Sequence, residues 1–382
     1  MKLLYFIPAL YNSGGMERVL SEKMNYLVRE YNNYEIIVVT TEQLGRPVFF
    51  PLDEQIKQIH LDIDFNNHYQ EPLLKKFIHH KQKLKSYKKN IIQILSEHKP
   101  DICISLCGKE IEFLYKIKDS TIKIAEIHFS MNVREQFISR KGNYLWKMLG
   151  KIRTLQLKKQ TKSLDKLVVL TQNDKKQWEK THKNIIVISN PNPLKPKEYL
   201  YNNESRTVIS VGRLDYQKGY DRLIDTWKIV AEKYPDWQLN IFGSGEDKNA
   251  LTKQIKQNHL EKDIHLKGIS NKIEEEYYKS SFYVMSSRYE GLPMVLIEAM
   301  ACGLPAISFD CEHGPREIIV NDMNGFLVPA FDINGLAEKI ILLIENEEKR
   351  IEMSFNAYET VKTYNISAIM KQWDTLFHSL IS

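Results

Sequence analysis

The chain has few cysteines and no long apolar run, which argues against a disulfide-rich protein and against a membrane-spanning one. Only four of its 382 residues are cysteines: Cys103, Cys107, Cys302 and Cys311. None forms a CxxC pair and all lie in or beside apolar strand-like segments, so we expect reduced core thiols rather than disulfides or a zinc site. No run of about 18 apolar residues exists, so no membrane-spanning helix is predicted. The opening MKLLYFIPAL lacks a small-residue cleavage site, which favours a buried first strand over a signal peptide.

Acidic residues are missing from two stretches of the first half. Residues 1–190 carry 32 Lys and Arg against 20 Asp and Glu, net +12, whereas the remainder carries 22 against 28, net −6. Residues 75–90 contain seven lysines and residues 140–162 eight basic residues, neither with an acid. The second stretch interleaves its charges with Tyr144, Leu145, Trp146, Met148 and Leu149, as is typical of a helix on an anionic membrane surface. The alternative is a solvated helix with its apolar side on the core. No nucleic-acid motif accompanies the charge, so no nucleic acid is expected as a partner.

The length suits two domains, and the order of patterns divides the chain accordingly. Residues 1–187 repeat a short apolar strand followed by a helical segment, which predicts a parallel sheet covered on both faces. Residues 188–205 break this periodicity with three prolines and read as a linker, after which the alternation restarts. We therefore predict an α/β fold with two Rossmann-like doubly wound domains, residues 1–187 and 188–365. The C-terminal helix, residues 366–382, is expected to pack back on the first.

Open α/β sheets bind ligands at the carboxyl ends of their strands, so the strand-to-helix turns hold the candidate residues. Gly14 and Gly15 open a helix after the first strand, where free amides and the helix dipole favour an anion. An ordinary flexible turn is the alternative. The turn of Gly243, Ser244 and Gly245 suits nucleotide contact, although it lacks the third glycine of GxGxxG.

The turn after the first strand of the second domain contains two cations. Gly212 and Arg213 begin it and Lys218 ends it, just before a helix. A guanidinium fork and an ammonium at one turn can converge on a single diphosphate. The alternative is that each side chain simply faces solvent.

The fourth turn lies in RYEGLPMVLIEAM, where an apolar segment carries Glu290 and Glu298. Gly291 and Leu292 directly precede a predicted helix, and Pro293 suits the first turn of that helix. The backbone amides of Met294 and Val295 are then free at the positive, N-terminal end of the helix. A carboxylate can accept both hydrogens of a vicinal diol, as in a ribose or a hexose. In the competing interpretation Glu290 caps the helix and Glu298 makes a surface pair.

Taken together, these motifs resemble one enzyme family. His128 in EIHFS, VGRLDYQKGYD, FGSGED and the E-x7-E stretch EGLPMVLIE, in this order, are similar to the retaining glycosyltransferases of family 4, within the glycosyl transferases group 1. The resemblance covers nearly the whole chain. It implies the GT-B fold, with two facing Rossmann-like domains and an interdomain cleft, the first binding the acceptor and the second the nucleotide-sugar donor.

The resemblance also implies residue roles. Glu298 would bind the donor ribose, and Arg213 and Lys218 would neutralise the diphosphate. Glu290 and the amides after Gly291 would hold the transferred sugar. Gly15 would donate near the phosphates, and His128 would lie beside the reacting face of the sugar.

The implied activity is that of a retaining, metal-independent hexosyltransferase. It would move a hexose-type sugar from a nucleotide-diphosphate sugar, with a UDP-sugar as first choice and no other cofactor, to a saccharide acceptor, either lipid-linked or an oligosaccharide. The implied setting is assembly of a bacterial surface polysaccharide, in the cytoplasm or at the inner face of the plasma membrane. Neither Asp62-Ile63-Asp64 nor His79-His80 is interpreted as a metal site.

Two other classes compete with this prediction. An NAD-dependent dehydrogenase would need a complete GxGxxG with an acid about 20 residues later, which neither first turn supplies. A non-catalytic nucleotide-sugar-binding or scaffold protein could share the fold. The motifs leave open the nucleotide base, the sugar, the acceptor with its linkage, and the oligomeric state.

Overall fold

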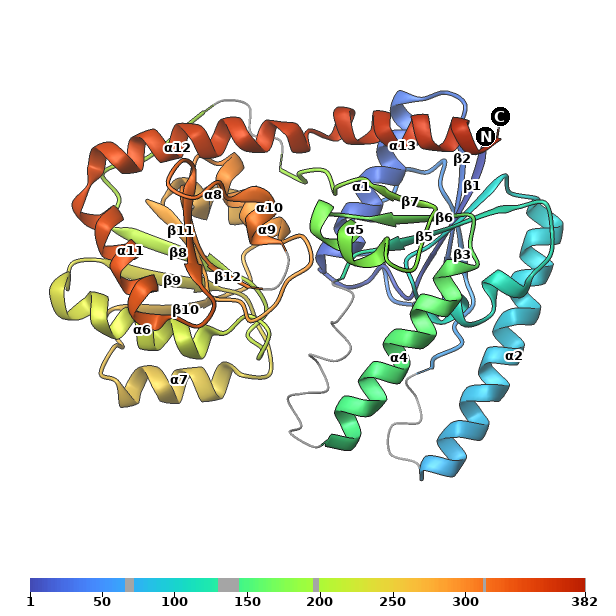
Figure 1. Cartoon of the computed structure of the whole chain (residues 1–382), viewed down its shortest axis with the longest axis horizontal. Coiled ribbons are helices and arrows are strands. Elements are labelled where there is room, and N and C mark those ends of the chain that lie inside the picture. The colour runs from blue at the N-terminus through green and yellow to red at the C-terminus, as the bar shows by residue number, and fades with distance from the viewer. Residues whose placement is uncertain (66–71, 130–143, 195–198, 312–313, 382) are drawn as a thin grey trace. The chain divides into compact units, whose positions relative to one another are not determined.

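The chain forms two compact units, each built on an open parallel sheet. The computed structural model describes residues 1–65, 72–129, 144–194, 199–311 and 314–381. Unit 1 comprises Met1–Pro191 with Ile366–Ser382, and unit 2 comprises Asn192–Asn365. Every strand pairing is parallel, and helices cover the sheets (Figure 1). The predicted class, two doubly wound Rossmann-like α/β domains, is confirmed.

The sheet of unit 1 has the order β3-β2-β1-β4-β5-β6-β7. Its strands are β1 (Lys2–Ile7), β2 (Glu35–Thr40), β3 (Lys57–His60), β4 (Ile102–Ser105), β5 (Ile122–Ile127), β6 (Lys166–Val169) and β7 (Ile185–Val187). Leu3 of β1 is in register with Ile36 on one side and with Ile102 on the other. The strand order therefore reverses between β1 and β4, which is where an open sheet of this kind binds ligands.

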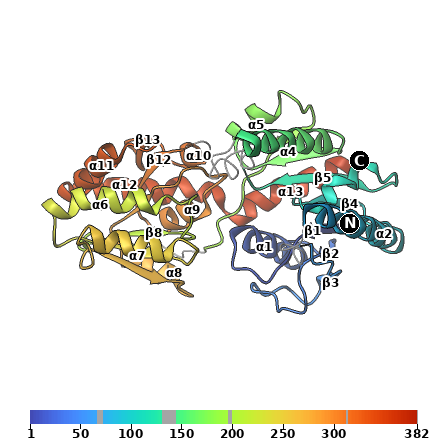
Figure 2. The same cartoon turned by 90° about the horizontal axis from the view of Figure 1, so that it is seen from below.

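The helices of unit 1 cover both faces of this sheet. They are α1 (Gly15–Glu30), α2 (Leu73–His98), α4 (Tyr144–Lys162), α5 (Gln172–Trp178) and α13 (Ile366–Ile381), with the short 3-10 helices η1 (Lys109–Glu112) and η2 (Leu114–Lys116). Tyr5 shares a core cluster with Met24 of α1 and Trp373 of α13. Its strand neighbour Phe6 packs instead with Tyr87 of α2, because successive side chains of a strand point to opposite faces. Seen from below, α1 lies beside β1 and β2, and α4 and α5 lie toward β5 (Figure 2).

The two basic stretches are located mainly on two long helices. Residues 75–90 fall within α2, and those from Tyr144 to Lys162 form α4. Residues 140–143 and the side chains of Tyr144, Leu145, Trp146 and Leu149 lie outside the described residues. Figure 1 shows α2 and α4 running away from the sheet of unit 1. Among the described residues, no helix combines the length and the apolar composition needed to cross a membrane.

Unit 2 repeats the same arrangement with the sheet order β10-β9-β8-β11-β12-β13. Its strands are β8 (Thr207–Val211), β9 (Gln238–Phe242), β10 (Ile264–Gly268), β11 (Phe282–Met285), β12 (Ala306–Asp310) and β13 (Gly325–Pro329). Its helices are α6 (Tyr220–Lys233), α7 (Lys248–Gln257), α8 (Ile273–Tyr278), α9 (Met294–Ala301), α10 (Pro315–Ile318), α11 (Ile333–Glu345) and α12 (Glu347–Val361), with the 3-10 helix η3 (Lys362–Tyr364). Here the order reverses between β8 and β11.

One large hydrophobic cluster holds unit 2 together. It joins α6, α7 and α11 to one face of the sheet through residues such as Leu223, Leu251 and Leu336. On the other face Tyr277 of α8 contacts Tyr283 of β11, and α9 packs against β11 and β12. All four cysteines of the chain are buried and none is in a disulfide, so the prediction of core thiols is confirmed.

The helix α13 is held on unit 1 by a continuous apolar stripe. Ile369, Met370, Trp373, Leu376 and Phe377 recur at helical spacing and all are buried in the cluster that contains β1 and α1. The Trp373 ring also lies 3.8 Å from the ammonium of Lys23 on α1. A segment more than 340 residues from β1 in sequence thus completes the first core.

We predict that Trp373→Ala destabilises unit 1 strongly. Because Trp373 is 1% exposed, its removal leaves a cavity and an uncovered Lys23 ammonium, and we expect a loss of about 3–5 kcal/mol in the free energy of unfolding. Denaturant titration measures it. Ile381→Ala is the matched control on the same helix, since Ile381 is 46% exposed. Equal, small losses for both variants would show that α13 does not belong to the core of unit 1.

Candidate functional site

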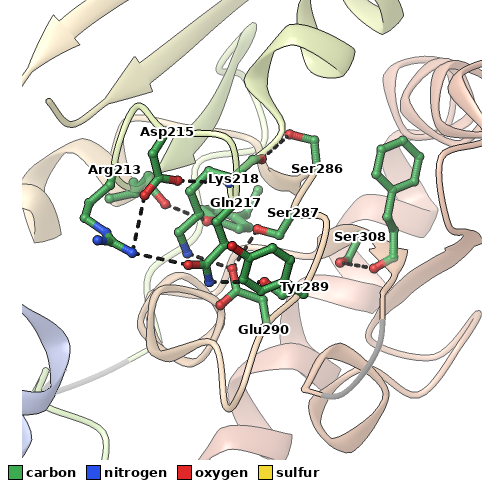
Figure 3. A network of polar contacts seen from close by, with 12 residues as sticks. Arg213, Asp215, Gln217, Lys218, Ser286, Ser287, Tyr289, Glu290 and Ser308 are labelled. Carbon is green, nitrogen blue, oxygen red and sulfur yellow. Dashed lines mark hydrogen bonds and ion pairs between the residues drawn. The ribbon is translucent and has the colours of Figure 1, made fainter. Parts of the chain in front are cut away.

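Two turns of unit 2 meet where the strand order reverses. The turn after β8 spans residues 212–219 and the turn after β11 spans residues 286–293. Lys218, at the end of the first, places its Nζ 2.7 Å from Oε1 of Glu290 in the second (Figure 3). Their side chains are 14% and 7% exposed. The structure therefore brings together two of the predicted residues at the edge of the sheet where ligands bind.

The backbone around Lys218 ties the two turns to each other. The Lys218 amide donates to Oδ1 of Asp215 at 3.2 Å, and its carbonyl accepts from the Ser286 hydroxyl at 3.0 Å. Gly219 has φ +65°, and a Cβ there would lie 2.2 Å from the Ser286 carbonyl oxygen. Only glycine permits this combination of backbone conformation and close approach.

Glu290 is nearly buried and is oriented by two donors. Besides Lys218, the Ser287 hydroxyl donates to Oε1 at 2.7 Å. The helix α9 begins at Met294 without a side-chain cap, so the interpretation of Glu290 as a capping residue is wrong. Pro293 is the N-cap residue of α9, one position before the first turn in which it was expected. The amides of Met294 and Val295 are in the first turn, where the helix itself supplies no acceptor.

A glycine from the next strand connection lies against the same turn. Gly314 has φ +84°, and a Cβ there would lie 2.2 Å from the Gly291 carbonyl oxygen and 3.3 Å from Cβ of Glu290. Gly291 and Leu292, the predicted approach to the helix, are thus held between the start of α9 and the start of α10. The sequence interpretation did not identify Gly314, although its position after β12 and before a helical proline was a usable signal.

Arg213 lies in the same turn as Lys218 but in a more exposed position. Its side chain is 67% exposed, with Nη2 3.3 Å from Oδ2 of Asp215 and 3.2 Å from Oε1 of Gln217. Gln217 in turn donates to the carbonyl of Tyr289 at 3.1 Å. A polar network therefore runs from Arg213 to the residue beside Glu290 (Figure 3). Gln217 was not among the predicted residues.

The turn of Gly243, Ser244 and Gly245 packs directly on the turn after β8. The Gly212 amide donates to the Phe242 carbonyl and the Leu214 amide to the Ser244 carbonyl, both at 2.9 Å. A Cβ on Gly243 would lie 1.9 Å from the Gly212 carbonyl oxygen, and one on Gly245 would lie 2.3 Å from that of Leu214. The glycines are therefore needed for the approach of two backbones, whatever else they contact.

Glu298 lies in the second turn of α9 and is 6% exposed, so the interpretation of a surface ion pair is wrong. The Tyr277 hydroxyl donates to its Oε2 at 3.4 Å. Tyr283, a residue of β11, has a pKa well above its usual value, mainly through burial, with Tyr220, Glu290 and Glu298 adding to the effect. Glu290 and Glu298 thus both lie close enough to Tyr283 to act on its hydroxyl.

Arg288 connects the turn after β11 to α6. Its guanidinium binds both carboxylate oxygens of Asp221 on α6, at 2.9 and 2.6 Å, and lies 4.1 Å from the ring centroid of Tyr216. Burial would lower its pKa, but Asp221 raises it. The arginine immediately precedes the predicted motif, and its role was not inferred from the sequence.

Three predicted residues belong to unit 1. Gly14 is the N-cap of α1 and Gly15 its first residue, directly after the β1 turn. A Cβ on Gly15 would meet no heavy atom within 4 Å, whereas one on Gly14 would lie 2.3 Å from Oε2 of Glu17. Glu17 accepts from Asn12 at 3.2 Å, so a carboxylate already occupies part of the positive end of this helix.

His128 follows β5 and its side chain is 8% exposed. Its Nε2 lies 2.9 Å from Oε1 of Glu126, and its Nδ1 lies 3.4 Å from Nδ2 of Asn190. The prediction placed His128 at the end of a strand, and the structure shows it there. Neither Glu126 nor Asn190 was identified from the sequence.

Relatives of known name match nearly the whole chain. An uncharacterized glycosyltransferase of Haemophilus influenzae is 32% identical over 97% of this chain and 98% of the relative. The amylovoran biosynthesis glycosyltransferase AmsD of Erwinia amylovora is 31% identical over 99% of both. A Campylobacter jejuni α-1,4-N-acetyl-D-galactosaminyltransferase, named for an undecaprenol diphosphate-linked substrate, is 26% identical over 98% of this chain and 97% of its own.

Solved structures agree on the fold. Sucrose-phosphate synthase of Thermosynechococcus elongatus superposes with a TM-score of 0.81 at 16% identity, over 99% of this chain and 98% of that one. Anabaena HepE in complex with UDP-glucose gives 0.72 at 16% identity, over 99% and 100%. At this identity the likeness establishes the GT-B fold alone.

The family assignment rests on sequence. The family described as glycosyl transferases group 1 matches residues 192–360, the part of the chain that contains the Lys218 and Glu290 turns. Together with the two relatives that exceed 30% identity over their full length, this match shows that the chain belongs to the glycosyl transferases group 1 family.

Proposed function

We propose that the chain is a retaining, metal-independent hexosyltransferase of family 4. It transfers a hexose-type sugar from a nucleotide-diphosphate sugar, with a UDP-sugar as first choice, to a lipid-linked saccharide acceptor during assembly of a bacterial surface polysaccharide. The observation that carries the proposal is the contact of Lys218 with Glu290 at the strand reversal of unit 2, with Arg213 in the same turn. Unit 2 is the donor-binding unit in this proposal and unit 1 the acceptor-binding unit.

The names of the relatives support the choice of substrates. The AmsD protein is named for amylovoran biosynthesis, and the Campylobacter jejuni enzyme for a saccharide on undecaprenol diphosphate. The HepE structure contains UDP-glucose. We extend these substrate classes to this chain because it spans nearly the full length of each of these proteins.

The chemistry requires positive charge where the leaving group forms. As the bond from the sugar C1 to the diphosphate oxygen breaks, that oxygen gains negative charge while the sugar becomes oxocarbenium-like. Lys218 and Arg213 supply fixed cations there, and the Gly15 amide adds a donor. The acceptor oxygen bonds to C1 on the same face and its proton passes to the departing phosphate, so the anomeric configuration is retained. No side chain is assigned as a nucleophile.

The two acids hold the ends of the donor in this proposal. Glu290 accepts from hydroxyls of the transferred sugar, helped by the amides of Met294 and Val295, and Glu298 accepts from the ribose. His128 lies beside the reacting face of the sugar. Glu290 and Lys218 are close enough to neutralise each other, so each would exchange this contact for a group of the donor when the donor binds.

A donor panel tests the activity. UDP-, GDP- and ADP-sugars are compared for thermal stabilisation of the protein and then for transfer, with the anomeric configuration of the product read by NMR. We expect one nucleotide class to stabilise the wild type and to be consumed with retention. Glu290→Ala should abolish transfer, whereas Glu275→Ala, which removes an exposed acid of the same unit, should not. Stabilisation of the wild type without any transfer or hydrolysis would favour the scaffold alternative.

A second prediction concerns the cation at the diphosphate. Lys218→Met keeps the length of the side chain but removes its charge, and we expect kcat to fall about 100- to 1000-fold, as for loss of one transition-state donor. Steady-state kinetics with the donor identified above measure it. In this variant the Glu290 carboxylate has lost its lysine partner, which costs stability. The double variant Lys218→Met/Glu290→Gln removes the unpaired carboxylate charge as well, so it separates loss of the lysine charge from loss of stability. Unchanged kcat in both would contradict a role at the phosphate. Lys272→Met, on the surface of the same unit, is the control.

The membrane part of the proposal rests on α4. Met148, Ile152 and Leu155 recur at i, i+4 and i+7 and are 49%, 42% and 63% exposed, so they form an apolar stripe on the outside of the helix. Lys151, Lys159 and Lys162 project on the same side of α4, and all are exposed. Apolar side chains flanked by lysines are the chemistry that an anionic bilayer surface attracts.

We therefore predict that the wild type sediments with vesicles that contain about a third anionic lipid and much less with neutral vesicles, because both charge and apolar insertion contribute. Replacing Met148, Ile152 and Leu155 by serine should abolish the association. Ile351→Ser/Phe355→Ser is the matched control, since these residues are 42% and 52% exposed on α12 of unit 2. Equal binding to neutral and anionic vesicles, or equal loss in the control, would refute the membrane contact.

A further inference from the structure

Unit 1 contains a buried polar cluster, and the proposed reaction assigns a role to only one of its members, His128. Glu126 lies on β5, and its Oε1 is 2.6 Å from Nζ of Lys23 on α1 and 2.9 Å from Nε2 of His128. The three side chains are 1%, 1% and 8% exposed. Burying charges is costly unless they are paired, so a carboxylate shared by two nitrogens at this depth needs an explanation.

Lys23 balances the charge of Glu126. Burial would raise the pKa of Glu126, but Lys23 and His128 outweigh it and lower the pKa to about 2. Burial lowers the pKa of Lys23, and Glu126 opposes this. Lys23 is also covered by the Trp373 ring at 3.8 Å, a contact that favours its charged form. Glu126 is therefore a carboxylate, and Lys23 is a charged partner for it besides His128.

Among the described residues, two further polar groups near the cluster, Tyr5 and Asn190, are uncharged. Tyr5 on β1 points its hydroxyl into the same region, and burial together with Glu126 keeps the pKa of this phenol well above its usual value. On the other side of the imidazole, Asn190 brings its Nδ2 to 3.4 Å from Nδ1 of His128. His128 thus has a pure acceptor at one ring nitrogen and a pure donor at the other.

This arrangement selects one form of the ring. The Glu126 oxygen lies 2.9 Å from Nε2 without hydrogen-bond geometry, and its negative charge favours an N–H over a lone pair on that nitrogen. An amide nitrogen can only donate, so Nδ1 must offer its lone pair to Asn190. The hydrogen-bond partner of one ring nitrogen sets which tautomer a histidine adopts.

We propose that Glu126 is a positioning residue that, with Lys23 and Asn190, holds His128 in the Nε2–H tautomer and in one orientation. The ring then presents a fixed dipole to the reacting sugar rather than carrying a proton to or from it. This inference rests on the proposed function, which places His128 beside the donor sugar. The competing explanation is that Lys23 and Glu126 form a stabilising ion pair with no effect on the ring.

Two double variants separate these explanations. Lys23→Met/Glu126→Gln and Lys23→Met/Glu126→Leu both remove the ion pair with side chains of similar size, but only the first keeps an acceptor oxygen opposite Nε2. Nitrogen-15 NMR of histidine-labelled protein, with the His128 signals assigned by their loss in His128→Gln, reports the tautomer. We expect the Nε2–H form in the wild type and in the glutamine variant, and a mixed or Nδ1–H form in the leucine variant.

Kinetics supply the second readout. We expect the leucine variant to lose at least about tenfold in kcat with the KM for the donor unchanged, because a misplaced group affects the reacting geometry more than binding. The glutamine variant should recover most of this loss. Asp119→Asn, which removes a different partly buried pair with Lys123 on β5, is the control and should change neither readout.

The outcomes are distinct. The same tautomer in both double variants, or equal kcat in both, would overturn the positioning role. If the tautomer responds as expected but the wild type transfers no sugar from any donor, the proposed function fails and the control of the ring by Glu126 is supported. Should either double variant fail to fold, Asn190→Ala replaces it, and this single change is expected to release Nδ1 and mix the tautomers.

Discussion

The contact between Lys218 and Glu290 is the interaction around which the rest of the site in unit 2 is arranged. Two charges 2.7 Å apart and largely shielded from water attract each other strongly, but each has given up most of its hydration. Such a pair is stable only while both partners are present or are replaced by groups of equal polarity. In the proposed function a diphosphate would replace Glu290 as the partner of Lys218, and sugar hydroxyls would donate to Glu290. The desolvation that makes the pair costly to break would then favour a ligand that is anionic at one end and rich in hydroxyls at the other.

Close approach of backbones is what allows these two side chains to meet. Gly219 lies against the Ser286 carbonyl, Gly243 against that of Gly212, and Gly314 against that of Gly291. In each case a Cβ would overlap a carbonyl oxygen that has little freedom to move. Four strand-to-helix turns, those after β8, β9, β11 and β12, thereby pack together at the carboxyl edge of the sheet, and Arg288 joins the β11 turn to α6 through Asp221. Packing between turns therefore explains why residues 219, 243 and 314 are glycines, independently of any contact with a nucleotide.

The buried parts of the fold could be predicted from sequence, and the exposed parts could not. Strands such as β1 and β8 are apolar runs bounded by glycine turns, and α13 has a continuous apolar stripe, so local patterns were sufficient. The edge strands β3 and β7 were missed because they are short and partly exposed, and β3 reads only KQIH. In the site, Lys218 and Glu290 were predicted from their places in separate turns. Their pairing and the partner Gln217 depend on tertiary contacts between segments about 70 residues apart, and the contact of Ser287 depends on a side-chain orientation that no spacing encodes. Gly314 contacts a turn about 20 residues earlier in the sequence.

Two lysine and glutamate pairs with little exposure, among the described residues, are not equivalent. Lys23 and Glu126 are each 1% exposed and Lys23 is covered by the Trp373 ring, whereas Lys218 and Glu290 are 14% and 7% exposed at the edge of a sheet. A ligand can replace a partner only where it can reach the charge, so the second pair suits direct binding and the first does not. Glu126 can act on a substrate only through a neighbour that extends toward the strand ends, and His128 is the residue in contact with it that does so. Burial would thus separate Glu290, which binds the donor in the proposed function, from Glu126, which we propose positions His128, although both are carboxylates paired with a lysine.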